Sequence, residues 1–164
     1  MKLPAHFISA TLLAISLGTV TGTAIATDTT HHHGHETHGT MELNQGQKWQ
    51  TDAALRQGMN ALHQIVSVGL DGAHANGLKS DDYKKMSGEI MTQFTYIVEN
   101  CDLEPEADAQ LHILLGNIIQ GVEVIEGKLP DEQPEDGLIK MAQALNGYGS
   151  YFEHPNWKSF DVSH

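Results

Sequence analysis

The chain has 164 residues with 21 acidic and nine basic side chains, which gives a formal net charge of −12 at neutral pH. This balance argues against a nucleic-acid partner, which needs a basic surface, and against docking on anionic lipid. Cys101 is the single cysteine, so an intramolecular disulfide is impossible and the fold has to rest on packing.

Residues 1–26 have the pattern of a secretory signal peptide. Met1-Lys2 gives a positive start, Phe7 to Val20 is a run of apolar and small residues without charge, and Ala24-Ile25-Ala26 is a small-x-small cleavage site. The run is shorter than the ~20 residues needed to span a bilayer. We therefore expect a cleaved signal peptide, a soluble periplasmic protein and no membrane span after cleavage.

Residues 27–50 form a polar segment without an apolar period, which predicts a disordered arm. Five histidines lie within eight residues of this arm: His31, His32, His33, His35 and His38. Imidazole binds Cu(II), Zn(II) and Ni(II), so the arm predicts a flexible transition-metal site, with copper the first expectation and zinc or nickel the alternatives. The simpler interpretation is a solvated low-complexity tail.

Residues 51–157 contain four segments whose apolar residues recur every three or four positions. The helices are expected to begin near Thr51, Ser80, Pro105 and Asp136, and the first to end in the glycine-rich residues 69–77. Short links and the absence of any period-two segment predict an all-α fold, an antiparallel up-down-up-down four-helix bundle. Residues 158–164 are expected to be a C-terminal tail.

Within the bundle, Met59 and His63 are four residues apart on one helix face, and His112 lies at a similar depth on the third helix. Cys101 and His154 are expected near the same end. This placement suggests an ordered metal site with His63 and His112, or a haem b site with Met59 and His112 as ligands. The simpler interpretation is a core methionine and satisfied boundary histidines. The absence of C-x-x-C-H excludes c-type haem.

The sequence lacks a G-x-S-x-G elbow, a phosphate loop and an H-E-x-x-H zinc helix, so no enzyme is predicted. An aromatic group near the C-terminus is expected to pack in the core, with a partner surface as the alternative. Its members are Tyr148, Tyr151, Phe152 and Trp157.

Three blocks of the sequence resemble a group of small exported bacterial proteins described as DnrO-like. The blocks are Leu43-Asn44-x-Gly46-x-Lys48-Trp49-x-Thr51-Asp52-x-x-Leu55-Arg56-x-Gly58-Met59, Asn100-Cys101-x-Leu103-x-Pro105-x-Ala107-Asp108-Ala109-x-Leu111-His112, and Ala144-Leu145-Asn146-x-Tyr148-Gly149-x-Tyr151-Phe152-x-His154-Pro155-x-Trp157. The resemblance implies export and a helical bundle behind a His-rich arm. The overall form is also similar to cytochrome b562-type bundles, in which Met59 would match a haem-ligating methionine.

These features predict a periplasmic protein that binds a transition metal for buffering or delivery. The alternative is a b-type haem-binding electron carrier, and a third hypothesis is a non-catalytic interaction module. The expected partners are the metal ion and a periplasmic transport or sensor protein.

Overall fold

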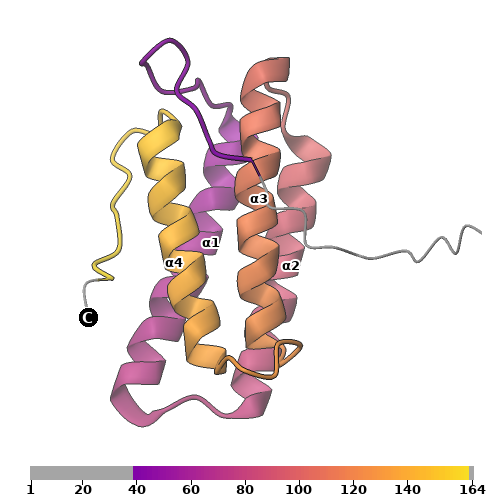
Figure 1. Cartoon of the computed structure of the whole chain (residues 1–164), viewed down its shortest axis with the longest axis vertical. Coiled ribbons are helices and arrows are strands. Elements are labelled where there is room, and N and C mark those ends of the chain that lie inside the picture. Colours follow the sequence, from indigo (N-terminus) through magenta and orange to yellow (C-terminus); the bar gives the residue numbers. More distant parts are fainter. Residues whose placement is uncertain (1–38, 163–164) are drawn as a thin grey trace, which may run out of the picture. The chain divides into compact units, whose positions relative to one another are not determined.

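The computed structural model describes residues 39–162, which lie in one compact unit (Figure 1). Four helices make up this part of the chain: α1 (Ala53–Asn76), α2 (Ser80–Asn100), α3 (Pro105–Ile125) and α4 (Pro134–Tyr151). It contains no strand, only two isolated β-bridges, so the prediction of an all-α fold is confirmed. The predicted signal peptide and the five arm histidines lie outside the described residues. None of the helices in residues 39–162 is long and apolar enough to cross a membrane.

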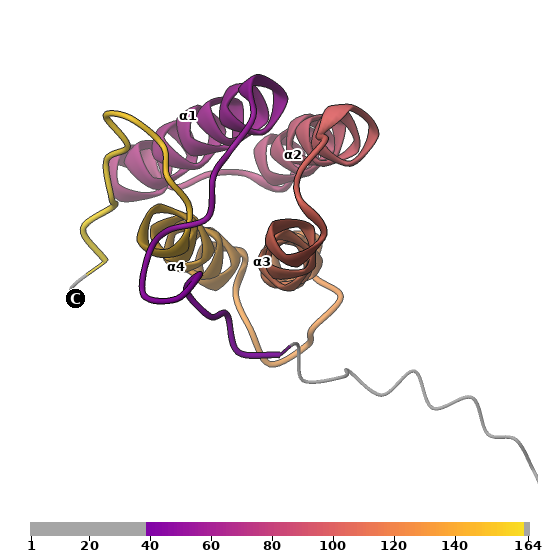
Figure 2. The same ribbon diagram turned by 90° about the horizontal axis from the view of Figure 1, so that it is seen from above.

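The four helices surround one apolar core, with α1 beside α2 and α4, and α3 beside the same two helices (Figure 2). Their predicted apolar stripes point inward, and Leu55, Met59 and Leu62 of α1 are fully buried. The closest pair is α3 and α4, because Gly121 and Gly137 let the two backbones meet. The α2 and α3 helices are the least closely packed neighbours.

Carboxylates satisfy the free amides at three of the helix starts. Asp52 caps α1 by accepting a hydrogen bond from the Leu55 amide at 2.6 Å, and its second oxygen accepts from the Asp102 amide at 2.7 Å. The helix therefore begins two residues after Thr51, because the Asp52 carboxylate reaches the third amide. At α2, which begins at Ser80 as expected, the N-cap is Lys79, and Asp82 accepts from its backbone amide.

The first helix ends at Asn76, within the glycine-rich residues 69–77 as expected, and so includes two of their glycines. Glycines disfavour a helix interior by ~1 kcal/mol each, yet α1 continues through Gly69 and Gly72 to Asn76. A Cβ atom on Gly69 would lie 2.8 Å from both Met86 Sδ and Met86 Cε, so this glycine makes room for the α2 side chain. Close packing of the two helices outweighs the local preference.

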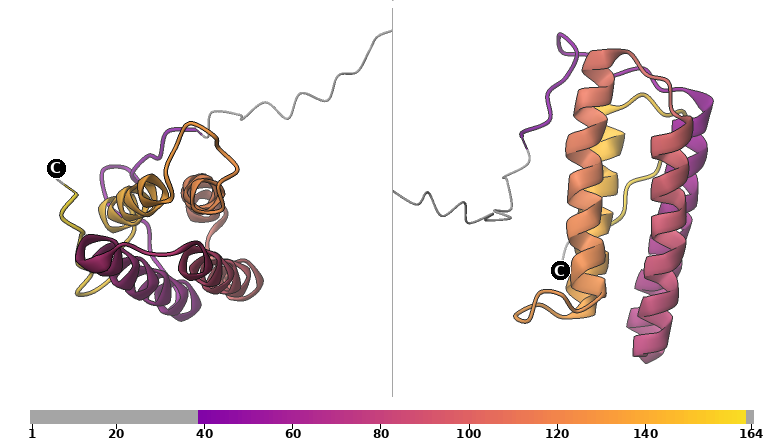
Figure 3. Two further views of the ribbon diagram at one scale, coloured as in Figure 1. Left: turned by 90° about the horizontal axis from the view of Figure 1, so that it is seen from below. Right: turned by 90° about the vertical axis from the view of Figure 1, so that its right-hand side faces the viewer.

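Residues 39–52, here called the strap, lie along one end of α3 and α4 (Figures 1 and 3). Glu42 donates its amide to Gln110 Oε1 at 2.8 Å, and Trp49 forms a parallel bridge with Phe152 through two backbone hydrogen bonds of 2.8 Å. The expectation that the disordered arm extends to residue 50 is therefore corrected, since residues 39–50 are bound to the bundle.

The segment after α4, which includes most of the predicted C-terminal tail, is bound to the helices. Asn146 of α4 binds both backbone groups of Phe160, accepting from its amide at 2.7 Å and donating to its carbonyl at 3.0 Å. Residues 152–162, here called the return segment, thus run back along α4 and α1. Residues 163 and 164 lie outside the description.

Candidate functional site

The strap contacts α3 near its first described residue. Gly39 lies against Ile113, since a Cβ atom on Gly39 would be 3.5 Å from the Ile113 Cδ1 atom. Met41, two residues further on, sits against Gly147 of α4 and lines a groove of about 290 Å3 between the two helices. The five arm histidines directly precede this attachment in the sequence.

His112 is exposed on α3, beside the attachment at Ile113. Its side chain is 68% exposed, and its Nδ1 atom lies 2.9 Å from the Asp108 carbonyl and 3.4 Å from the Asp108 carboxylate. A carbonyl can only accept, so Nδ1 carries the proton and the Nε2 lone pair is free. Hydrogen bonding of one ring nitrogen to a carbonyl or carboxylate is the usual arrangement behind a metal-binding imidazole.

His63 is used differently. Its Nε2 atom donates to the Lys158 carbonyl at 2.9 Å, and its ring stacks on Phe160 with a centroid separation of 4.1 Å. Trp157 meets the same ring edge-on at 5.0 Å. His63 therefore holds the return segment against α1, and a metal would have only its Nδ1 atom to bind.

Met59 is fully buried in the core, and His112 lies on the surface. His112 lines a groove of about 460 Å3 between α2 and α3, and Met59 is not among the residues around that groove. Met59 and His112 therefore do not line a common pocket in which a haem could bind. Across residues 39–162, no three His, Cys, Asp or Glu side chains are grouped so that they could hold a metal ion.

Cys101 and His154 both lie beside Tyr148, at the end where the strap and the return segment meet. The Tyr148 hydroxyl is 2.9 Å from the His154 Nδ1 atom. Burial, followed by the nearby carboxylates of Asp52 and Asp108, raises the pKa of the Cys101 thiol to about 12. Burial and the Arg56 guanidinium lower the pKa of His154, and burial raises the pKa of Tyr148.

At neutral pH this end accordingly holds a thiol, a phenol and a neutral imidazole. A thiol with so high a pKa is a poor nucleophile, because the thiolate is the reactive form. The aromatic group around Tyr148 is packed inward: Tyr148 and Phe152 are fully buried, and Trp157 fits against Gly149. This packing supports a structural role for these rings more than a partner surface.

Side chains of residues 48–56 fasten this end of the bundle. Lys48 donates to the Gly149 carbonyl at 2.6 Å, Thr51 to the Glu153 carbonyl at 2.6 Å, and the Trp49 indole to the Glu42 carbonyl at 2.6 Å. Arg56 donates to both the carbonyl and the hydroxyl of Thr51.

Two functional partners were missing from the sequence-based set. Asp108, four residues before His112, follows the i, i+4 rule for helices and could have been found from its spacing. Tyr148 as the partner of His154 has no such signal, because the contact depends on how the chain leaves α4. No family model, curated protein or solved structure matches the chain.

Proposed function

We propose that the protein captures a transition-metal ion in the periplasm, copper first and zinc or nickel after it, for buffering or delivery. The metal is held by the arm histidines His31, His32, His33, His35 and His38. The observation that carries the proposal is their density, five imidazoles within eight residues directly ahead of the attachment on α3. Near neutral pH a large share of such imidazoles is unprotonated, because their reference pKa is ~6.5.

His112 serves in this proposal as a further ligand supplied by the bundle. Its Nε2 atom is free, and Gly39 touches Ile113, the next residue along α3. His35 is four residues before Gly39, and an extended chain spans at most ~3.6 Å per residue. His112 is included as a ligand because its side chain is exposed and its second ring nitrogen is free.

The proposal includes removal of residues 1–26 on export and transfer of the ion to a periplasmic transport or sensor protein. It also includes helices that alternate up and down, as their short links favour. It describes a binding protein and not an enzyme. Near neutral pH the side chains of Cys101, Tyr148 and His154 are uncharged. Uncharged side chains of this kind suit packing better than acid–base chemistry. Haem binding is left as the weaker alternative, because Met59 is enclosed by the core.

Calorimetric titration with Cu(II), Zn(II) and Ni(II) tests the proposal on the exported, untagged protein. We expect replacement of all five arm histidines by alanine to weaken binding about 100-fold, and His112→Ala alone to weaken it about fivefold. Replacing Thr29, Thr30 and Thr37 by alanine is the matched control, since it changes the same segment without removing imidazole. Equal affinity of the parent and the five-histidine variant would contradict the proposal.

A further inference from the structure

The groove between α2 and α3 is apolar along its length. Phe94 and Val98 of α2 face Leu115 and Ile119 of α3 across about 460 Å3. Val98 is 55% exposed, one of the few large apolar side chains of residues 39–162 that is open to solvent. The groove lies at the seam where neighbouring helices pack least closely, and its volume is in the range of small-molecule sites.

Hydrogen-bond acceptors line both ends of this groove. His112 and Glu123 of α3 are eleven positions apart, which is about 16 Å along a helix. The free Nε2 atom of His112 and the carboxylate of Glu123 both accept hydrogen bonds. No lysine or arginine lines the groove. Lys128 lies close enough to attract Glu123, but its ammonium group is bound to Glu126 at 2.6 Å.

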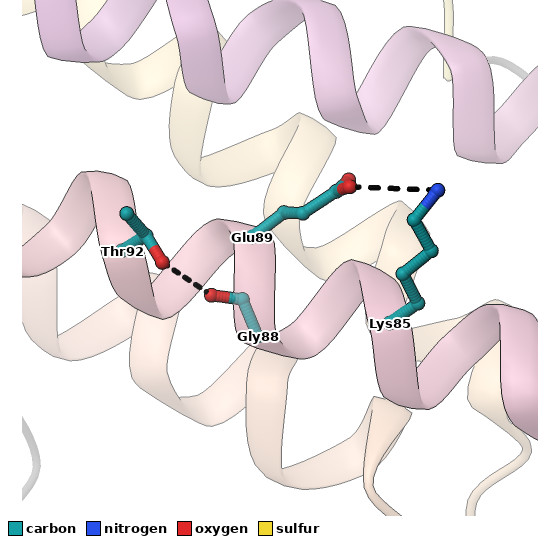
Figure 4. A network of polar contacts seen from close by, with 4 residues as sticks. All are labelled: Lys85, Gly88, Glu89 and Thr92. Atoms are coloured by element: carbon teal, nitrogen blue, oxygen red, sulfur yellow. Dashed lines mark hydrogen bonds and ion pairs between the residues drawn. The ribbon is translucent and has the colours of Figure 1, made fainter.

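The groove on the other side of α2 differs in this respect (Figure 4). Glu89 and Thr92 line that groove, of about 420 Å3, between α1 and α2. Glu89 pairs with Lys85 at 3.7 Å, and the Thr92 hydroxyl donates to the Gly88 carbonyl at 2.8 Å within the same helix. The only charged side chain that lines this groove, Glu89, is thus already paired with a lysine.

We infer that the α2–α3 groove binds a small cationic amphiphile, a molecule with an apolar body and an ammonium-type group. The apolar body packs on Phe94, Val98 and Ile119, and the positive group lies at Glu123. The excess of 21 acidic over nine basic side chains adds a long-range attraction for such a ligand. This inference does not rest on metal capture by the arm, although His112 takes part in both proposals.

Calorimetry in the presence of EDTA, with decyltrimethylammonium and decyl sulfate below their micelle concentrations, tests the inference on the whole exported protein. The two ligands share a tail and differ in charge. We expect one cation per chain, with decyl sulfate about tenfold weaker or worse. Glu123→Gln should weaken the cation about fivefold, as expected for a partly exposed ion pair.

Val98→Arg places a positive charge in the groove at an exposed position, so it should lower the affinity for the cation about tenfold. Val68→Arg is the matched control: Val68 is 64% exposed and lines the α1–α2 groove, and its replacement should leave the affinity within about twofold. Equal binding of both detergents, or equal losses in the two arginine variants, would overturn the inference. It would also be overturned if a basic amphipathic helical peptide bound here and the small cation did not.

Discussion

Tyr148 is a polar side chain with full burial, and its hydroxyl depends on one neighbour. The phenol oxygen is 2.9 Å from His154 Nδ1, and it makes no other hydrogen bond to the described residues. Burial and Arg56 disfavour the charged form of His154, which lowers its pKa. Because the folded protein holds this histidine neutral, its contribution to stability is present above the unfolded pKa of ~6.5. That contribution is lost as the pH falls through the lowered pKa.

The His154→Asn variant tests this linkage. We expect it to lower the free energy of unfolding by about 1 kcal/mol at pH 7.5, because a buried hydrogen bond is lost. At pH 5 the difference from the parent should shrink, since the parent also has to protonate its histidine. Urea unfolding at the two pH values measures both quantities. A difference that stays constant or widens toward pH 5 would contradict the assigned direction.

At the residue scale, the sequence predicts some contacts and not others. The pairing of Asp108 with His112 follows from helical spacing. The use of His63 to hold Phe160 and Lys158 does not, because these partners are 95 or more positions away and lie in a segment without periodicity. Predicting an ordered site from Met59, His63 and His112 assumed that each of them was available to a ligand.

At the scale of elements, the apolar period predicts all four helices and most of the buried residues. The apolar period does not predict that the strap is bound to the helices. The strap is held by backbone hydrogen bonds and by Trp49 rather than by a repeated apolar face. The apolar period does not predict the close contact between α3 and α4 either. It depends on two glycines that a pattern of apolar residues treats as gaps.

Gly137→Ala tests that contact. A Cβ atom there would lie 2.6 Å from the Gly121 carbonyl oxygen and 2.9 Å from the Ile125 amide nitrogen. Backbone atoms cannot rotate away, so α3 and α4 would have to separate, at a cost of about 1–3 kcal/mol. Gly88→Ala in α2 is the matched control: it meets nothing within 4 Å and should stabilise the helix by about 0.5–1 kcal/mol. Thermal unfolding distinguishes the two, and equal effects would refute the close contact.

The whole molecule carries an excess of negative charge that opposes its own compaction. Raising NaCl from 20 to 500 mM at pH 7.5 should therefore raise Tm by about 1–3 °C, since salt screens exposed charges. At pH 5 the net negative charge is smaller, because imidazole groups with a reference pKa of ~6.5 gain protons, so the salt effect should shrink. Circular dichroism melts at both pH values test this. A Tm that falls with salt at pH 7.5 would contradict it.

The bridge between Trp49 and Phe152 joins two stretches of chain about a hundred positions apart. Each stretch also has an anchor of its own, the strap through Glu42 on Gln110 and the return segment through Asn146 on Phe160. Loss of the bridge would therefore remove two backbone hydrogen bonds without releasing either stretch, and would expose the backbone at Glu153, next to His154. The bridge thus ties the strap to the residue that partners the buried Tyr148 hydroxyl.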